Sequence, residues 1–233
     1  MEYSNSHLEF CLESKQSIFR GLSSREKEAL AQTHVVAQYR KGDPVASEGS
    51  KPHGLICLAA GKVKVFKEGV GGREQILRMV RPLGLIGYPA VFSDNTYYAS
   101  AVAIEDSVGV SFEKNTLIRL IKKNPDLALK LMKFLALELG FCHNRTVSLT
   151  QKHVRGRIAE SLLVLRETYG LEEDGRTINA YMSREDIASL SNMTTSNAIR
   201  TLSHLASEDI ISLDGKKIKI LDSCKLQRIS EIG

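Results

Sequence analysis

The sequence predicts an α+β fold, with a β-rich first half and a helical second half. Between His34 and about Phe112, short apolar or alternating runs recur between glycine-containing turns. From Asn115 onward the apolar residues recur at helical spacing instead. Many short strands separated by glycines favour an antiparallel sandwich or barrel over alternating strand–helix units. We therefore expect a β domain followed by a helical region.

The β region contains six strand-like runs, with Gly71-Gly72 as a hairpin tip. A turn and a short helix precede it within residues 17–33, and Ser23 or Ser24 is the expected cap of that helix. The expected strands are residues 35–39, 55–58, 63–66, 75–80, 101–104 and 108–112.

Composition indicates an ordinary globular chain of one or two domains. Of its 233 residues, 42% are hydrophobic and 25% are charged. No apolar run reaches the length of a membrane span, and the N-terminus lacks a signal pattern, so we expect a cytoplasmic protein without a membrane partner. The cysteines lack the close spacing of zinc or iron–sulfur ligands, which predicts reduced, packed thiols and no metal site; they are Cys11, Cys57, Cys142 and Cys224.

The mildly basic balance of the chain does not by itself indicate nucleic-acid binding. The net charge is +5, yet residues 151–233 hold twelve basic and twelve acidic residues. The excess lies in residues 1–150, with twenty basic and fifteen acidic residues. Any electrostatic footprint for DNA must therefore come from local placement of charge.

A long helix is expected to follow a short one at Asn115–Lys123, with Pro125 at its start. One apolar stripe, at residues 127, 131, 134 and 141, is suited to packing on the β domain. A helix apolar on two faces is either enclosed in a larger core or shared with a second subunit, and interleaved charges favour a homodimer. The expected dimer seam is Met132, Leu135, Leu139, Cys142, Thr146 and Leu149, with polar Thr146 weakening its end.

Residues 183–205 predict two helices joined by a tight turn. Ser183 and Asp186 have the spacing of a capping box, and Ile187 and Leu190 share one face of the first helix. Asn192 and the following methionine interrupt the pattern where a turn is needed.

The second helix of this pair combines a buried stripe with a polar outer face. Thr194 or Thr195 is its expected cap. A polar helix braced by a shorter one has the geometry that enters the DNA major groove, although an ordinary helical hairpin has the same pattern. The expected buried residues are Ala198, Leu202 and Leu205, and the outward ones are Thr195, Ser196, Asn197 and Arg200.

Two further segments flank the helix pair. A helix at 152–169 ends at Gly170, and the acidic loop 172–175 is interpreted as surface charge because no neutral ligand interleaves its carboxylates. Residues 210–221 form two strand-like runs around Asp214-Gly215, which predicts a basic wing. Its lysines, Lys216, Lys217 and Lys219, are expected to contact phosphates.

This order of parts resembles the family of the cyclic-AMP receptor protein and the fumarate-and-nitrate-reduction regulator (CRP/FNR) over nearly the whole chain. The stretches that carry the resemblance are 61–66 with 72–77, 85–92, 154–165 and 183–188. The resemblance implies a jelly-roll, cyclic-nucleotide-binding-like domain at 1–124, a dimerisation helix at 125–151 and a winged helix-turn-helix domain at 152–233. It also implies a homodimer that binds two-fold sites on double-stranded DNA and acts on RNA polymerase.

At the effector site the sequence departs from the family pattern. The family's ribose-binding glutamate aligns with Tyr88, and its phosphate-binding arginine and adjacent serine or threonine align with Tyr98 and Ala99. A phenol supplies only a neutral donor to a buried phosphate, so binding of cyclic AMP is not expected. The tyrosines either line a cavity for another ligand or fill the barrel. The effector pocket that the resemblance implies comprises Gly87, Tyr88, Tyr97, Tyr98, Ala99, Cys142 and His143.

No cofactor is predicted, and the effector is left unidentified. Family members that hold an iron–sulfur cluster carry a group of N-terminal cysteines, which the lone Cys11 does not provide. Haem needs axial ligands, for which His34, His53 and His143 are the available residues, but a lone histidine is more often structural.

The family's DNA-reading positions align with Thr195, Ser196, Ile199 and Arg200. Arg200 matches the family arginine and is the expected bidentate contact to guanine. Ser196 replaces a common glutamate, so the half-site should differ from the family consensus. Ser183 and Arg184, at the start of the first helix, are better placed for phosphate.

The leading hypothesis is therefore a dimeric DNA-binding transcription regulator. The chain is not expected to be an enzyme, since it has no phosphate-binding glycine loop, metal-binding histidine spacing or nucleophile motif. The alternatives are a haem- or other small-ligand sensor of the same fold, and an interaction protein whose helix pair no longer binds DNA.

Overall fold

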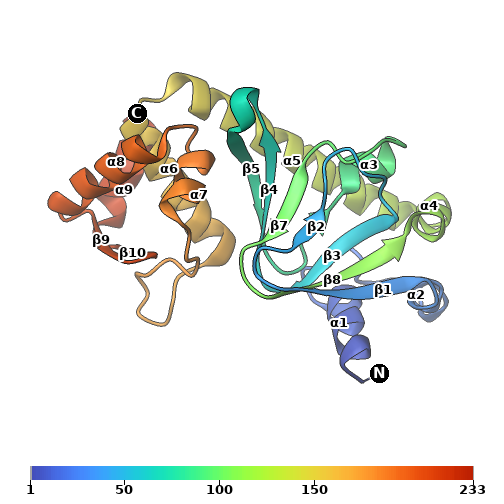
Figure 1. Cartoon of the computed structure of the whole chain (residues 1–233). Helices are drawn as coiled ribbons and strands as arrows, with labels where there is room; N and C mark the ends of the chain where they lie inside the picture. Colours follow the sequence, from blue (N-terminus) through green and yellow to red (C-terminus); the bar gives the residue numbers. More distant parts are fainter. Residues whose placement is uncertain (1, 233) are drawn as a thin grey trace. The chain divides into compact units, whose positions relative to one another are not determined.

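The computed structural model describes the backbone of residues 2–232 and the side chains of residues 6–232. It has the expected α+β fold (Figure 1). Two compact units emerge, one comprising residues up to Lys67 with Arg78–Leu139, and the other Glu68–Leu77 with Gly140 onward. The boundary between them falls within a single long helix, α5 (Pro125–Gln151).

The β unit is an antiparallel jelly roll of two four-stranded sheets. One sheet has the strand order β1-β8-β3-β6 and the other β2-β7-β4-β5. The strands are β1 (His34–Tyr39), β2 (Pro44–Ala46), β3 (Gly54–Ala60), β4 (Val63–Glu68), β5 (Glu74–Val80), β6 (Leu85–Ile86), β7 (Ser100–Ala103) and β8 (Ser107–Glu113). All six strand-like runs expected from the sequence are strands, while the short β2 and β6 were not predicted.

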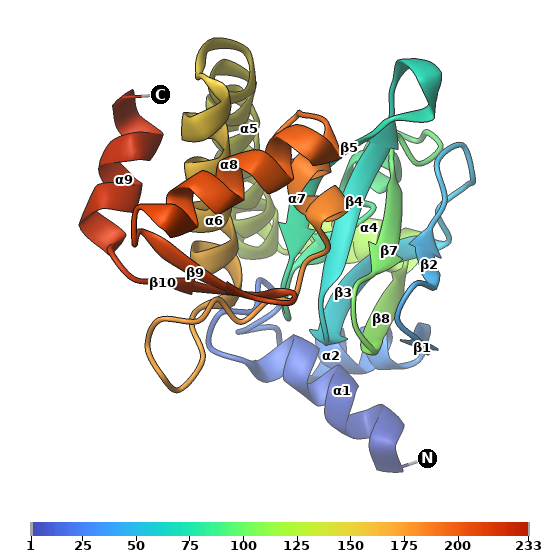
Figure 2. The same ribbon diagram turned by 60° about the vertical axis from the view of Figure 1, so that its left-hand side comes forward.

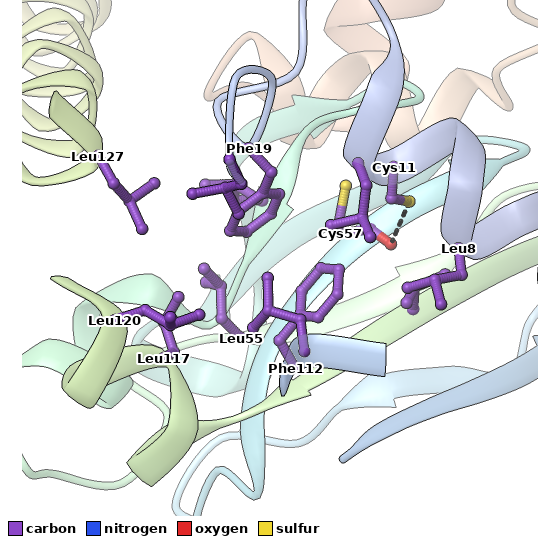
Figure 3. Packing of buried hydrophobic residues seen from close by; sticks show 14 of the residues in the cluster. Leu8, Cys11, Phe19, Leu55, Cys57, Phe112, Leu117, Leu120 and Leu127 are labelled. Carbon is purple, nitrogen blue, oxygen red and sulfur yellow. Dashed lines mark hydrogen bonds between the residues drawn. The ribbon is translucent and has the colours of Figure 1, made fainter. Parts of the chain in front are cut away.

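Helices cover the face of the first sheet that points away from the second sheet. Figure 3 shows this core, in which the rings of Phe19 and Phe112 lie 4.8 Å apart and the Cys11 thiol donates to the Cys57 carbonyl. These helices are α1 (Glu2–Glu13), α2 (Ser24–Ala31), α4 (Lys114–Lys123) and the first part of α5. Cys11 and Cys57 are buried here and are packed thiols, as expected, whereas Cys142 and Cys224 are exposed, so the expectation of packing was wrong for these two.

The opposite face of the same sheet packs on the second sheet. Val45 and Ala46 from β2, Ile56 and Leu58 from β3, and Val63 from β4 are among its buried residues. Between β6 and β7 lies the five-residue helix α3 (Tyr88–Phe92), and a 3₁₀ turn at Val70–Gly72 forms the tip between β4 and β5. Gly71 and Gly72 both have positive φ, as the predicted hairpin tip requires.

The C-terminal part of the second unit is helical with one hairpin. Figure 2 shows helix α6 (Val154–Tyr169), the pair α7 (Arg184–Leu190) and α8 (Thr195–Ser207), strands β9 (Ile211–Asp214) and β10 (Lys217–Ile220), and α9 (Ser223–Ile232). Asp214 pairs with Lys217, so the two-residue loop of the hairpin is Gly215-Lys216 and not the Asp214-Gly215 that the sequence suggested. Helices α1, α3 and α9 were not predicted.

Candidate functional sites

Helix α7 begins and ends through specific hydrogen bonds. The Ser183 hydroxyl accepts from the Asp186 N–H at 3.0 Å, and the Asp186 carboxylate accepts from the Ser183 N–H at 3.3 Å, which is the predicted capping box. After the helix, the buried Ser191 hydroxyl donates to Ser161 of α6 at 2.8 Å. Asn192 then adopts a left-handed φ of 51° and turns the chain into α8. These bonds fix the angle at which α8 begins.

Helix α8 is held by one apolar stripe. Ala198, Leu202 and Leu205 have no exposed surface, as the sequence predicted. The Thr194 hydroxyl accepts from the Asn197 N–H at 3.3 Å and caps the helix, which settles the choice between Thr194 and Thr195. The stripe and the cap together determine which residues face away from the unit.

The outward face of α8 carries the residues proposed for base contacts. Thr195, Ser196 and Arg200 are exposed and Asn197 is half-buried. Within residues 2–232 the Arg200 guanidinium has no hydrogen bond or ion pair, so all its donors are available to a ligand. Ile199 beside it is 46% exposed, which adds an apolar contact surface to this polar face.

The β9–β10 hairpin is less basic than its sequence suggests. Lys217 lies 3.8 Å from a Glu172 carboxylate oxygen and over the Tyr181 ring, and Lys219 lies 3.2 Å from Asp174. Lys216, at the tip, has no such partner among the described residues. The acidic loop therefore neutralises two of the three wing lysines, which sequence spacing did not show.

Asp174 also organises its own loop. Its carboxylate accepts from the N–H groups of Thr177 at 2.7 Å and Arg176 at 2.9 Å, and these bonds hold its pKa well below the ordinary value. Arg184, expected at a phosphate, donates to the Gly215 carbonyl of the wing at 2.8 Å. Helix α7 and the wing are thus tied together by a side chain next to the Ser183 cap.

Buried Arg145, from α5, anchors the helix pair to the end of the long helix. Its guanidinium donates to the Leu190 carbonyl at the end of α7, and burial lowers its pKa while the Glu160 carboxylate raises it. Glu160 also accepts from Ser148 at 2.8 Å and pairs with Lys152 at 2.8 Å. Arg145, one of the charges interleaved with the expected dimer seam, therefore makes contacts within its own chain.

In the β unit, the position aligned with the family's ribose-binding glutamate belongs to a polar cluster that spans β5, α3 and α5. The Tyr88 hydroxyl donates to Glu138 Oε2 at 2.8 Å, and Arg78 Nη1 donates to the same oxygen at 2.6 Å. Arg78 also donates to the Tyr88 oxygen at 3.1 Å and to the Leu85 carbonyl at 2.8 Å. The side chains of Arg78 and Glu138 are only 15% and 22% exposed. Each charged group is thus already compensated within the protein.

Sequence reasoning did not identify Arg78 and Glu138 as parts of this site. A signal existed for Arg78, because strand alternation puts it on the same face as buried Ile76 and Val80. Glu138 had no such signal, since it is one of several charges spaced along α5.

The other aligned effector residues also make internal contacts. Gly87 has a φ of 84°, and a Cβ there would lie 2.6 Å from Cε1 of the Tyr97 ring, so this ring fills the space beside Gly87. Tyr98 is 49% exposed, and its hydroxyl lies 3.1 Å from Ser93 Oγ and 2.9 Å from Asn95 Nδ2. Ala99 is half-buried. The chain thus brings Gly87, Tyr88 and Tyr97 together, while Tyr98 lies over the end of α3.

Cys142 and His143, the remaining expected pocket residues, are exposed and belong to the other unit. His34 Nδ1 lies 2.6 Å from the Ala31 carbonyl, which gives it a structural role, and His53 is exposed. Within the described residues, no group of three histidine, cysteine or acidic side chains is arranged to hold a metal ion. In the same part of the chain, no helix is long and apolar enough to span a membrane.

Two family patterns match the chain in the order of its two structural parts. The cyclic nucleotide-binding domain matches residues 36–124, and the Crp-like helix-turn-helix domain matches residues 156–229. The chain belongs to the CRP/FNR family. Members of this family are transcription regulators and not enzymes.

Similar proteins extend over most of the chain. A "CRP-like cAMP-activated global transcriptional regulator" of Mycobacterium tuberculosis is 28% identical over 92% of this chain and 96% of its own length. The "Cyclic AMP receptor protein" of Thermus thermophilus is 26% identical over 91% of this chain and 96% of its own. The structure of FixK2 from Bradyrhizobium japonicum has a TM-score of 0.76 and 23% identity, and covers 84% of this chain and 97% of that one. The fold and the general role of this CRP/FNR protein are thereby established.

The Tyr88 cluster predicts an unusual tyrosine titration. Burial, with the Glu138 charge and hydrogen bond opposed by Arg78, raises the pKa of Tyr88 from 10 to about 12. Because the folded-state pKa is the higher one, the free energy of unfolding should fall as pH rises from about 10 to about 12. Carbon-13 NMR of tyrosines labelled at Cζ should assign this midpoint to Tyr88.

Two substitutions should move this midpoint in opposite directions. Glu138→Gln removes a negative charge and should lower the Tyr88 pKa, whereas Arg78→Gln removes a positive charge and should raise it. A shift of the Tyr88 pKa in the same direction in both variants would contradict the assignment of Arg78 and Glu138 as its charged neighbours.

Proposed function

We propose that this CRP/FNR regulator reads DNA through α8, with Arg200 as the principal base contact. The observation that supports the proposal most directly is the exposed, unpaired guanidinium of Arg200 on a helix whose opposite face is fully buried. A bidentate arginine suits guanine O6 and N7 in the major groove. Thr195, Ser196 and Asn197, nearer the helix start, complete the proposed base-reading surface.

Phosphate contacts position the helix in this proposal. Lys216 at the wing tip has no ion-pair partner within the described residues 2–232, while Lys217 exchanges its weak pair with Glu172 for a phosphate. Ser183 and Arg184 lie at the start of α7, and Arg184 exchanges its bond to the Gly215 carbonyl for a phosphate oxygen. Because residues 151–233 have no net charge, DNA binding depends on this local arrangement of cations. The affinity for DNA should fall as the salt concentration rises.

We propose a homodimer built on α5, since several of its large apolar side chains are exposed on the single chain. Met132 is 58% exposed and Leu139 is 57% exposed, and they lie seven residues apart, on one face of the helix. Leu135 and Leu149 are half-buried, and Cys142 and Thr146 are exposed. A second copy of α5 would cover this stripe and place two α8 helices for a two-fold DNA site. As in the family, such a dimer would act on RNA polymerase in the cytoplasm.

We also propose that cyclic AMP is not the effector. Tyr88, at the position aligned with the ribose-binding glutamate, already donates to Glu138, and Arg78 is paired with the same carboxylate. The family's phosphate-binding positions hold Tyr98 and Ala99, which carry no positive charge. A desolvated phosphate monoanion would therefore lack a compensating cation.

Arg200→Ala should weaken binding to a specific site by about 1–3 kcal/mol, or roughly five- to 150-fold, and relax preference at one base pair. Selection of bound sequences from random DNA, followed by titration, measures both effects. Arg228→Ala, which removes an exposed arginine of α9, is the matched control and should leave both unchanged. Unaltered base preference in the Arg200 variant would contradict the assignment of Arg200 as a base contact.

Leu139→Glu should convert a dimer to a monomer, because two carboxylates would face each other across an apolar seam. Sedimentation equilibrium measures the association state. Lys133→Glu, an exposed charge reversal on the same helix outside the seam, should remain dimeric. A monomeric parent protein, or a dimeric Leu139 variant, would refute the proposed interface.

Isothermal titration of the full chain with cyclic AMP and cyclic GMP should give no saturable heat at micromolar concentrations. The physical reason is the missing cation described above. The Mycobacterium tuberculosis relative, whose name describes activation by cyclic AMP, serves as the positive control under the same conditions. Saturable micromolar binding to this chain would overturn the proposal.

A further inference from the structure

The jelly roll contains a hollow that is not lined by Tyr88, Tyr98 or Ala99, the positions that align with the family's nucleotide-binding residues. On strand β8 the residues that face the second sheet are all small, namely Ser107, Gly109 and Ser111. The strand's opposite face carries large residues instead, including Val110 and Phe112. Strand β2, on the second sheet, has only three residues and so leaves part of the first sheet uncovered. Small residues opposite a short strand leave unfilled volume.

This volume is a cavity of about 430 Å³ near Ser111. Ser111 pairs with Val35 of β1 and with Ile56 of β3, and both of these residues line the cavity. Ala37 and Val45 add to the apolar wall. The size lies within the range of pockets that hold small organic molecules. Of the expected effector-pocket residues, Tyr97 lines it, whereas Gly87, Tyr88, Tyr98 and Ala99 do not, so the cavity lies beside the aligned nucleotide position and does not coincide with it.

The polar side chains of the cavity are hydroxyls, an imidazole and the ammonium of Lys51, all of which can donate hydrogen bonds. Tyr39 and Tyr97 are half-buried, and within residues 2–232 their hydroxyls have no hydrogen-bond partner. Burial raises the pKa of both phenols, so they remain neutral donors near pH 7. Lys51 and His53 are exposed members of the lining and likewise have no partner in the described part of the chain. Among the lining residues there is no acidic side chain.

We propose that this cavity binds a small organic carboxylic acid, whose apolar body contacts Val35, Ala37 and Ile56 and whose carboxylate faces Lys51 and His53. An apolar body excludes water from the inner wall, while the carboxylate keeps its charge beside the exposed ammonium of Lys51 and the imidazole N–H of His53. The phenol hydroxyls of Tyr39 and Tyr97 donate to the second carboxylate oxygen or to a further polar group of the ligand.

Tyr97 links this cavity to the Tyr88 cluster. Its backbone is fixed by hydrogen bonds to Gly49 and Ser50, both 2.9 Å long, while its ring lies against Gly87. A ligand that displaces the ring pushes on Gly87 and thereby on Tyr88, which is bonded to Glu138 of α5. The regulatory consequence of binding rests on the proposed function, whereas the binding site itself does not.

The test uses the full chain with benzoate and hexanoate as probes and their uncharged amides as matched controls. Saturation-transfer NMR detects binding, and calorimetry measures affinity. The acids should bind more tightly than the amides, and Ser111→Phe, which fills the cavity, should abolish binding. Lys51→Gln should weaken the acids roughly two- to fivefold, as loss of an exposed ion pair does, whereas Lys41→Gln should have no effect.

Several results would overturn the proposal. They are the absence of binding of either acid at millimolar concentration, equal affinity for acids and amides, or undiminished binding by a folded Ser111→Phe protein. Ala37→Leu supplies a smaller filling variant if circular dichroism shows that the phenylalanine disrupts folding. A mobility-shift assay distinguishes the binding site from its proposed regulatory effect. Binding of the acid without any change in DNA affinity contradicts only the regulatory effect. Failure of DNA binding with the acid site intact counts against the proposed function alone.

Discussion

Strand β8 is buried on both faces, and the architecture of the β unit depends on this double burial. Val110 and Phe112 pack against helices, while on the other face Gly109 lies between Tyr39 and Ile56 of the neighbouring strands β1 and β3. A strand with two apolar environments cannot slip by one residue without exchanging them. The same strand therefore fixes the position of the helices that cover one face and of the β2 and β7 strands that cover the other.

The Arg78, Tyr88 and Glu138 cluster places mutually compensating charges at the position aligned with the family's ribose-binding glutamate. Two charged groups and a phenol satisfy one another in a mostly buried setting, where removal of one partner leaves an uncompensated charge. Arg145, Glu160 and Leu190 repeat this arrangement in the other unit. In both units, α5 contributes one of the charged residues, so the long helix is bound by polar contacts as well as by its apolar stripe.

What could be predicted from the sequence was local. The capping residues Ser183 and Thr194 and the stripe of Ala198, Leu202 and Leu205 follow from spacing within one or two helical turns. Strands β2 and β6 are too short to show alternation, and α9 lies beyond the last strand-like run. Arg78 and Glu138 are sixty residues apart, and no local pattern pairs them. The neutralised wing lysines were missed for the same reason, because their partners lie in a separate loop.

The exposed face of α8 separates two properties that many proteins must satisfy with the same residues. Ser196 and Arg200 are exposed, whereas the stability of the helix depends on Leu202 and its buried neighbours. Exposed substitutions away from caps usually alter stability by no more than about 0.5 kcal/mol. With α8 in its proposed DNA-reading role, the outer residues are free to diverge among descendants of this chain, and a lineage can acquire new target sequences while its folding remains unchanged.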